Sequence, residues 1–201
     1  YRNGDGVTED DSQAVYWYKK AAEQGHAKAQ YNLGVMYSYG EGVAEDDTQA
    51  VYWYKKAAEQ GDAAAQYNLG NMYDFGKGVT EDDTQAVYWY RKAAEQGVAI
   101  GQWSLATMYQ YGEGVAEDDT QAVYWYRKAA EQGNTHAQFS LGLMYDFGYG
   151  VAEDDTQAVY WYRKAAEQGY AKAQYNLGLK YGKGEGVAED YILAYKWANL
   201  A

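Results

Sequence analysis

Residues 86–97 read AVYWYRKAAEQG, and nearly the same segment stands at four other places in the chain. The other copies occupy 14–25, 50–61, 122–133 and 158–169, with either Lys or Arg as the sixth residue. Tryptophan therefore falls at Trp17, Trp53, Trp89, Trp125, Trp161 and, in a divergent last copy, Trp197, so each step is 36 residues. A fixed period of roughly 20 to 50 residues is typical of a solenoid or another repeat array.

Each copy predicts two helices, and the copy over 62–97 shows why. Its stretch 62–75, DAAAQYNLGNMYDF, is rich in Ala, Gln, Leu and Met, which favour helix. Gly76 and Gly78 interrupt that helix, and Val79 is expected to bury its side chain where the loop turns back. The first half of the copy is therefore one helix followed by a loop.

The second half of the copy begins with acidic residues and predicts a helix over about 83–95. Asp82 and Gln85 have the spacing of an N-cap and a capping box. Carboxylates at this end also interact favourably with the helix dipole. Gly97 is the expected C-cap. Repeated helix–loop–helix units without a strand signal predict an all-α solenoid of helix pairs.

Apolar residues at helical spacing indicate the core of each copy. In the copy over 62–97 they are Leu69, Met72 and Tyr73 in the first helix and Ala86, Trp89, Tyr90, Ala93 and Ala94 in the second. Gly70 is expected to let the helices approach closely. Burial of one tryptophan removes about 150–250 Å² from water, or roughly 4–6 kcal/mol before opposing terms. Because one copy cannot bury both faces alone, the copies must stack on their neighbours.

We predict a single array over residues 1–201 with about five and a half units. The units are a partial copy over 1–25, full copies over 26–61, 62–97, 98–133 and 134–169, and a divergent, partial copy over 170–201. The chain begins without Met in the middle of the pattern, and its last segment still follows the second-helix pattern. We therefore expect a fragment of a longer array, whose apolar ends could make end-to-end contacts.

The composition narrows the classes of function. With 29 acidic and 17 basic side chains the net charge is −12, which disfavours nucleic acid as a partner. Cysteine is absent, so disulfides and thiolate metal sites are excluded. No apolar run approaches the roughly 20 residues of a transmembrane helix, so membrane insertion is not expected.

Three features that look like chemical sites have simpler interpretations. Glu-Asp-Asp triplets begin at Glu9, Glu45, Glu81, Glu117 and Glu153, without the ligand spacing of a calcium loop. We interpret them as helix caps and as an acidic rim that could steer a basic partner. The G-x-G pairs lack the lysine of a phosphate loop and are interpreted as turn glycines. His26 and His136 occupy different repeat positions, so no metal site, cofactor or catalytic triad is expected.

Over essentially its whole length the repeat pattern resembles the Sel-1-like repeat (SLR) family, a relative of the tetratricopeptide repeat. In the copy over 63–97 the resemblance rests on Ala65, Leu69, Gly70, Tyr73, Gly76, Gly78, Val79, Asp82, Ala86, Trp89, Tyr90, Lys92, Ala93, Ala94 and Gly97. It implies a right-handed superhelix of antiparallel helix pairs, with the first helices on the concave surface. It also implies a non-catalytic bacterial scaffold or adaptor for a protein or peptide, periplasmic or secreted rather than cytoplasmic.

Two other functions stay open. A cysteine-rich branch of the family is linked with β-lactam binding, which makes a small-molecule binder or hydrolase one alternative. This chain has no cysteine, so nothing of that branch carries over residue by residue. The other alternative is a purely structural spacer.

Comparison of the copies with one another indicates where a partner could bind. Gln30, Leu33 and Tyr37 are the same in all five first helices, whereas the positions of residues 28, 32, 35 and 39 vary. Spacings of 4, 3 and 4 residues place the variable positions on one stripe of the helix. Positions that pack against an identical neighbour stay the same, and positions that meet solvent or a partner are free to differ.

We therefore predict that a partner binds at this variable stripe. The candidate residues are Lys28, Asn32, Val35, Tyr39, Asn68, Asn71, Phe75, Ser104, Thr107, Tyr111, His136, Ser140, Leu143, Phe147, Asn176 and Leu179. Amides mixed with aromatic rings suit a groove for an extended peptide or a helix. Drift on an exposed face is the alternative, and Val35, Leu143 and Leu179 argue against it because such drift favours polar residues. The aromatic residues of the stripe could instead pack on the next loop.

The second helices offer another surface. Tyr16, Tyr52, Tyr88, Tyr124 and Tyr160 form a ladder on the outer face expected for these helices. The ladder is either a second contact surface or a set of rings that lie along Lys or Arg side chains of the neighbouring copy. We favour the second interpretation.

Overall fold

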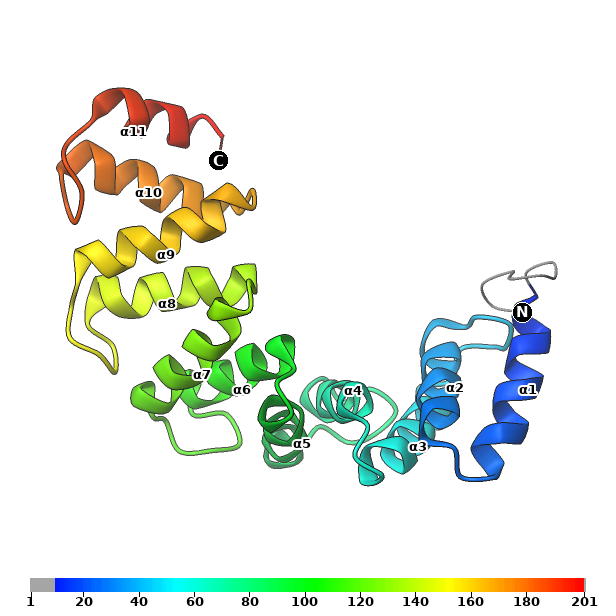
Figure 1. Ribbon diagram of the computed structural model, residues 1–201. Helices are drawn as coiled ribbons and strands as arrows, with labels where there is room; N and C mark the ends of the chain where they lie inside the picture. The colour runs from blue at the N-terminus through cyan, green and yellow to red at the C-terminus, as the bar shows by residue number, and fades with distance from the viewer. Residues whose placement is uncertain (1–9, 201) are drawn as a thin grey trace. The chain divides into compact units, whose positions relative to one another are not determined.

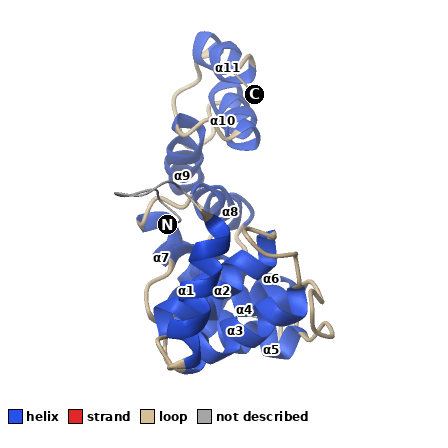
Figure 2. Cartoon of the chain, turned by 90° about the vertical axis from the view of Figure 1, so that its right-hand side faces the viewer, coloured by secondary structure: helices blue, strands red, loops and turns tan. Residues whose placement is uncertain are grey.

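The computed structural model describes residues 10–200, and every regular element in that range is a helix (Figures 1 and 2). The helices are α1 Asp11–Glu23, α2 Ala27–Tyr39, α3 Asp47–Glu59, α4 Ala63–Asp74, α5 Asp83–Glu95, α6 Ala99–Tyr111, α7 Asp119–Glu131, α8 Thr135–Phe147, α9 Asp155–Glu167, α10 Ala171–Lys183 and α11 Tyr191–Ala198. The all-α prediction is confirmed. The start of the partial copy over 1–25, with Glu9, lies outside the described residues.

The chain divides into two compact units, Tyr1–Val98 and Ala99–Ala201. In the first unit each of the helices α1 to α4 packs against the next one in the chain, and in the second unit each of the helices α6 to α10 does the same (Figure 1). This is the packing of a solenoid, in which each element contacts its sequence neighbours. The even-numbered helices are the first helices of the copies, and the odd-numbered helices are the second helices.

The second helices begin where their acidic residues predict. Helix α5 starts after Asp82, whose Oδ1 accepts a bond from the Gln85 backbone N–H at 3.0 Å. The capping-box prediction is wrong in its other half: the Asp82 N–H donates to the Tyr73 carbonyl at 3.0 Å. That bond ties the start of the second helix to the first helix of the same copy.

The predicted core residues are buried within each unit. Leu69, Ala86 and Tyr90 are at most 1% exposed, and Trp89 is 8% exposed. Trp53 of α3 packs against Ala29 and Leu33 of α2, in its own copy, and against Ala22 of α1, in the copy before. Trp53 thus joins its copy to the one before it. Trp17, in the first described helix, is 50% exposed.

The invariant glutamine of the first helix also joins neighbouring copies. Gln66 is buried, and its Nε2 donates to the Ala58 carbonyl at 3.1 Å. Its Oε1 accepts a bond from Gln96 Nε2 at 2.7 Å, and Gln138 makes the same two bonds in the second unit. A buried amide without these partners would be costly, which explains why the residue does not vary between copies.

Glycines allow the closest contacts. A Cβ on Gly70 would lie 2.6 Å from the Tyr90 ring, so only a residue without a side chain leaves room for the ring at this position. Gly78, in the G-x-G loop, has a φ of 65°, and a Cβ there would lie 2.3 Å from the Asp47 carbonyl carbon. The turn interpretation of the G-x-G pairs is confirmed, and the same glycine is also a packing residue.

Candidate partner-binding surface

Buried tyrosines of the second helices extend to the variable stripe of the first helices. Tyr54, Tyr90, Tyr126 and Tyr162 are at most 2% exposed. The Tyr90 hydroxyl lies 2.7 Å from Asn71 Oδ1 and 2.8 Å from Asp74 Oδ2. In the second unit the Tyr126 hydroxyl lies 3.2 Å from Thr107 Oγ1. The polar stripe residues therefore satisfy the hydroxyls of buried tyrosines, in addition to any contact that they make with a partner.

The ionisation of these tyrosines reflects the same environment. Burial raises the pKa of Tyr126 to about 12, although hydrogen bonds with Thr107 and Ser140 oppose the shift. Burial likewise raises the pKa of Tyr54, against the hydrogen bonds of Ser38 and Asn68. Both hydroxyls therefore stay neutral at physiological pH, and that of Tyr126 donates to Gln110 Oε1 at 2.7 Å.

In the first unit the stripe lines a pocket of about 230 Å³. Its walls are Ser38 and Tyr39 from the end of α2, Glu45 and Asp47 from the start of α3, Tyr54, and then Asn68, Asn71, Met72, Phe75 and Lys77 from α4 and its loop. Tyr39 and Phe75 are 72% and 65% exposed. The pocket thus combines aromatic rings, amides and two carboxylates.

The second unit contains a pocket of about 380 Å³ at the same repeat positions. It is lined by Asp146, Phe147, Glu153, Asp155, Asn176, Leu179, Lys180, Lys183 and Glu185. Each of these lies three periods, or 108 residues, after a residue that lines the pocket of the first unit. The repeat therefore builds the same kind of pocket in both units.

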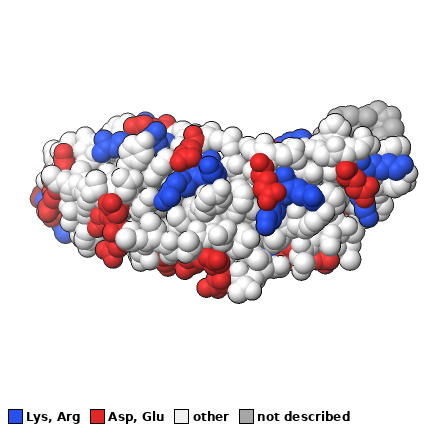
Figure 3. All heavy atoms as spheres, turned by 90° about the horizontal axis from the view of Figure 1, so that it is seen from below, with Lys and Arg blue, Asp and Glu red and all other residues white. Residues whose placement is uncertain are grey.

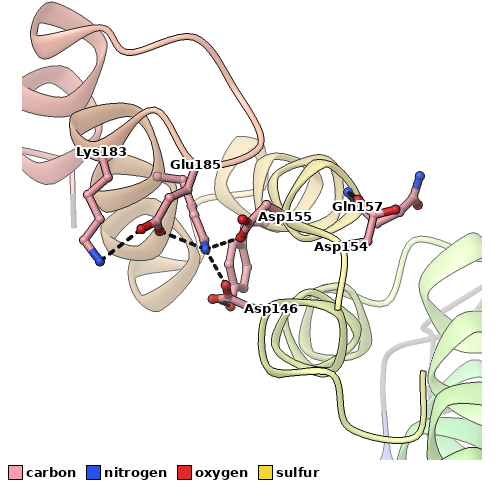
Figure 4. A network of polar contacts seen from close by, with 8 residues as sticks. Asp146, Asp154, Asp155, Gln157, Lys183 and Glu185 are labelled. Carbon is pink, nitrogen blue, oxygen red and sulfur yellow. Dashed lines mark hydrogen bonds and ion pairs between the residues drawn. The ribbon is translucent and has the colours of Figure 1, made fainter. Parts of the chain in front are cut away.

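The two pockets differ in their charged residues: Ser38, Met72, Phe75 and Lys77 of the first pocket correspond to Asp146, Lys180, Lys183 and Glu185 of the second. Lys180 stands where the other first helices have Met36, Met72, Met108 and Met144. Its ammonium forms ion pairs with Asp146, with Asp155 at 2.6 Å and with Glu185 at 3.1 Å (Figure 4). The Lys180 side chain is only 9% exposed. A cation of the chain itself thus occupies the acidic part of the second pocket.

The pKa of Lys180 follows from these contacts. Burial alone would lower it, but the hydrogen bonds that Lys180 donates to Asp146, Asp155 and Glu185 raise it above its ordinary value. Lys180 is therefore fully charged at physiological pH. The Tyr162 hydroxyl donates to Asp146 Oδ2 at 2.8 Å, so the network also reaches a buried tyrosine.

A third pocket, of about 250 Å³, lies beside the stripe of the second unit and is mainly aromatic. The stripe residues Thr107, Tyr111, His136, Ser140 and Leu143 line it together with Trp103, Gln110, Tyr126, Phe139, Tyr170 and Lys172. The His136 ring lies 5.4 Å from the Trp103 ring and 5.3 Å from the Tyr170 ring, centroid to centroid. His136 thus belongs to an aromatic cluster.

The remaining stripe residues lie outside these pockets. Lys28 is exposed, with its ammonium 4.5 Å from the centre of the Tyr31 ring. Asn32 is half-buried, Val35 packs against the core, and Ser104 is buried. The stripe is therefore most open at its aromatic positions, because Tyr111 and Phe147 are also 64% and 58% exposed.

The tyrosine ladder of the second helices has a different explanation from the one we favoured. Tyr52 and Tyr88 are each 49% exposed, and each lies next to the lysine four residues later in the same helix, Lys56 and Lys92. The neighbouring copy does not supply these cations, because the i, i+4 spacing already places one beside each ring. The face in Figure 3 shows acidic and basic side chains interspersed.

Two features of the pockets were not predicted from the sequence. The acidic triplets were interpreted as caps and a rim, whereas Glu45 and Asp47 also line a pocket. Lys180 was not singled out, although it interrupts a column of four methionines.

Within residues 10–200 no group of three or more His, Cys, Asp or Glu is placed to hold a metal ion. No helix in that range is long and apolar enough to cross a bilayer.

Comparisons with known proteins agree with the repeat pattern. The family model described as Sel1 repeat matches residues 1–26, 27–62, 63–98, 99–134, 135–170 and 171–201. A comparison with curated proteins gave no match.

Similar solved structures are bacterial. One, a protective antigen of uropathogenic Escherichia coli with an SLR fold, is 44% identical with a TM-score of 0.96; the match covers 100% of this chain and 43% of that one. A Sel1 repeat protein from Oxalobacter formigenes is 37% identical with a TM-score of 0.85, over 94% of this chain and 80% of that one. An immunity protein from Pseudomonas aeruginosa is 25% identical with a TM-score of 0.56, over 100% and 78%. This chain spans less than half the length of the first.

Proposed function

Because the chain belongs to the Sel1 repeat family, whose repeats mediate protein–protein interaction, we propose that it binds a protein or peptide along its first helices. Members of this family are generally non-catalytic scaffolds, and we propose the same for this chain. A partner segment would lie over the exposed aromatic residues at the ends of α2 and α4 in the first unit, or of α6 and α8 in the second.

The observation that carries this proposal is the pocket built at the same repeat positions in both units. Each pocket opens beside an exposed ring, Phe75 in the first unit and Phe147 in the second. Aromatic anchors next to polar groups are typical of surfaces that recognise another polypeptide. A spacer would have no need for exposed rings at this place.

The small-molecule alternative has less support. The chain has no cysteine to make the scaffold of the β-lactam-linked branch. We expect no turnover of a chromogenic β-lactam by the purified chain. Sustained hydrolysis that follows the protein through purification would replace the scaffold proposal with an enzyme.

Site-specific photo-crosslinking tests the binding surface. A photoreactive phenylalanine analogue is placed at Phe75 or Phe147, and in matched variants at Tyr88 or Tyr160 of the second helices, which are 49% and 48% exposed. We expect a crosslinked protein from bacterial extract at the first pair of positions, and its purified form should bind the unlabelled chain.

A triple variant provides the quantitative control. Phe75→Ala, Tyr111→Ala and Phe147→Ala together should weaken binding of that purified partner at least about tenfold, because each removes an exposed aromatic anchor. Circular dichroism checks that the helices are retained. Unchanged affinity of the folded triple variant, or crosslinks confined to Tyr88 and Tyr160, would contradict the proposal.

We also propose a periplasmic or secreted location. A similar protein is described as a protective antigen, which suits exposure at the bacterial envelope. Fractionation of the source cells, followed by detection of the chain with an antibody, tests this location, and a purely cytoplasmic signal would contradict it.

A further inference from the structure

We propose that the pocket of the first unit takes a basic side chain of the partner, arginine in preference to lysine. This inference rests on the proposed function and specifies the chemistry of the partner. The pocket is the one lined by Tyr39, Glu45, Asp47, Asn71 and Phe75, hereafter the α2–α4 pocket.

The second unit shows what the acidic part of such a pocket accommodates. Asp155 has the repeat position of Asp47, and it pairs with the ammonium of Lys180 at 2.6 Å. Asp146 and Glu185 hold the same ammonium, and their repeat positions are those of Ser38 and Lys77 in the first unit, so Asp155 is the partner of Lys180 that the α2–α4 pocket shares (Figure 4). A charged side chain that is 9% exposed is thus accepted here, because the carboxylates offset its loss of water.

In the α2–α4 pocket that internal cation is missing. Met72 takes the position of Lys180, so the neighbouring side chain carries no charge. Among residues 10–200 no Lys, Arg or His forms an ion pair with Glu45 or Asp47, and Lys77 at the edge of the pocket is exposed. The carboxylates are available for a cation from outside, and the charge of the pocket is complementary to a basic side chain.

The rim of the pocket favours a guanidinium group. Tyr39 and Phe75 are 72% and 65% exposed and line the same pocket as the carboxylates. A guanidinium stacks on aromatic rings and donates several hydrogen bonds at once, whereas an ammonium is smaller and more strongly hydrated. The side-chain oxygens of Asn68 and Asn71 add acceptors at the wall.

Methyl NMR of the chain with two small probes tests this inference directly. The chain has four methionines, and Met72 lines the pocket, so a sample labelled at the methionine methyl groups carries its own reporter. Met72→Leu assigns the signal. The probes are the amides of N-acetylarginine and N-acetylcitrulline, which differ in charge but hardly in shape. We expect the Met72 signal to report binding of the arginine probe about three- to tenfold tighter than of the citrulline probe.

Paired variants link the effect to the carboxylates. Glu45→Gln with Asp47→Asn should abolish the preference for the arginine probe while the helices are retained, because Asp46 remains the N-cap of α3. Glu59→Gln with Glu95→Gln removes the same net charge from exposed sites and should leave the preference intact. Equal affinity of the two probes for the unaltered chain, or a preference that survives Glu45→Gln with Asp47→Asn, would overturn the inference.

Lys180→Met gives an independent test in the second unit. It removes the internal cation and places a methionine where the other copies have one. The methyl signal of that methionine should respond to the arginine probe more strongly than to the citrulline probe. A folded Lys180→Met variant whose new signal responds equally to both probes would also overturn the inference.

These outcomes separate the inference from the proposed function. Crosslinks at Phe75 and Phe147 together with equal affinities for the two probes would leave the binding surface in place and reject the basic side chain. Charge-selective probe binding without any partner on the first helices would support the pocket and reject the proposed function.

Discussion

Asp47 and Asp155 occupy the same position of the repeat but face different side chains, Met72 in one copy and Lys180 in the other. The second pocket holds a cation of the chain itself because Lys180 replaces a methionine and because Asp146 and Glu185 stand where the first unit has Ser38 and Lys77. The variable stripe was predicted from the copies themselves, but the pocket was not. The carboxylates of the pocket come from one copy and its amides from a helix of the next. The pattern of variable positions on a single helix could not predict that these groups meet.

Loss of the internal cation should destabilise the second unit. Lys180→Met leaves Asp146, whose side chain is 13% exposed, close to two other carboxylates without compensation. We expect the free energy of unfolding to fall by about 1–3 kcal/mol. Urea unfolding measures the change. Lys183→Met, at a side chain that is 60% exposed, is the control and should change it by less than about 0.5 kcal/mol. Equal effects of the two changes would contradict the account of the network.

The buried tyrosines make stability depend on alkaline pH. Burial raises the pKa of Tyr126 to about 12, and it also raises the pKa values of Tyr54 and Tyr162. Unfolding returns each hydroxyl to a pKa of about 10, so the unfolded chain loses these protons first. The contribution is therefore complete below about pH 10 and is lost as the pH rises further, by about 1.4 kcal/mol per pH unit for each tyrosine.

Two signals recorded across that pH range check this dependence. Tyrosinate absorbance should rise in two steps, because burial makes Tyr54, Tyr126 and Tyr162 keep their protons to a higher pH than an ordinary tyrosine does. The second step should coincide with the loss of the helical circular dichroism signal. A single absorbance step near pH 10 with full helicity would contradict the burial of these hydroxyls.

At the scale of the helix and its loop, the sequence predicted the structure closely. The second helix of the copy over 62–97 was expected over about 83–95 and is Asp83–Glu95. An acidic N-cap and a closing glycine bracket each such helix, and these local signals are independent of packing. The reciprocal bond of the capping box was not foreseen correctly, because the Tyr73 carbonyl of the preceding helix takes the Asp82 N–H.

Removal of one cap tests the local signal. Asp82→Ala deletes the Oδ1 that accepts the Gln85 N–H, and we expect a loss of about 1 kcal/mol in the free energy of unfolding. Glu81→Ala removes the neighbouring, exposed carboxylate and should cost much less. Thermal unfolding followed by circular dichroism compares them. If Glu81→Ala lowers the free energy of unfolding as much as Asp82→Ala does, the destabilisation comes from the removal of a negative charge and not from the removal of the N-cap.

Two loop glycines separate backbone strain from close packing. Both have positive φ, but an added Cβ meets nothing within 4 Å at Gly97, whereas at Gly78 it would lie 2.3 Å from the Asp47 backbone. Gly97→Ala should cost about 1 kcal/mol through strain alone. Gly78→Ala should cost clearly more, because α3 must also shift. Similar costs in urea unfolding would show that the loop moves freely away from α3.

For the molecule as a whole, the charge and the repeat lead to the same kind of partner. The net charge is −12, and the α2–α4 pocket adds carboxylates beside exposed rings. Excess acidic charge accelerates the encounter with a basic partner, and salt weakens that effect. The net charge and the 36-residue period are visible in the sequence. How the charges gather around one pocket in each unit becomes visible only when neighbouring copies are stacked.

The central claim is that the first-helix surface, and not the second-helix surface, binds a polypeptide. The most direct measurement is the affinity of a peptide selected from a random displayed library for two folded variants of the chain. We predict that Tyr39→Ala with Phe75→Ala weakens binding at least about tenfold, and that Tyr52→Ala with Tyr88→Ala, which removes equally large exposed rings from α3 and α5, leaves it within about twofold. The reverse pattern, or equal affinity of both variants, would contradict the account.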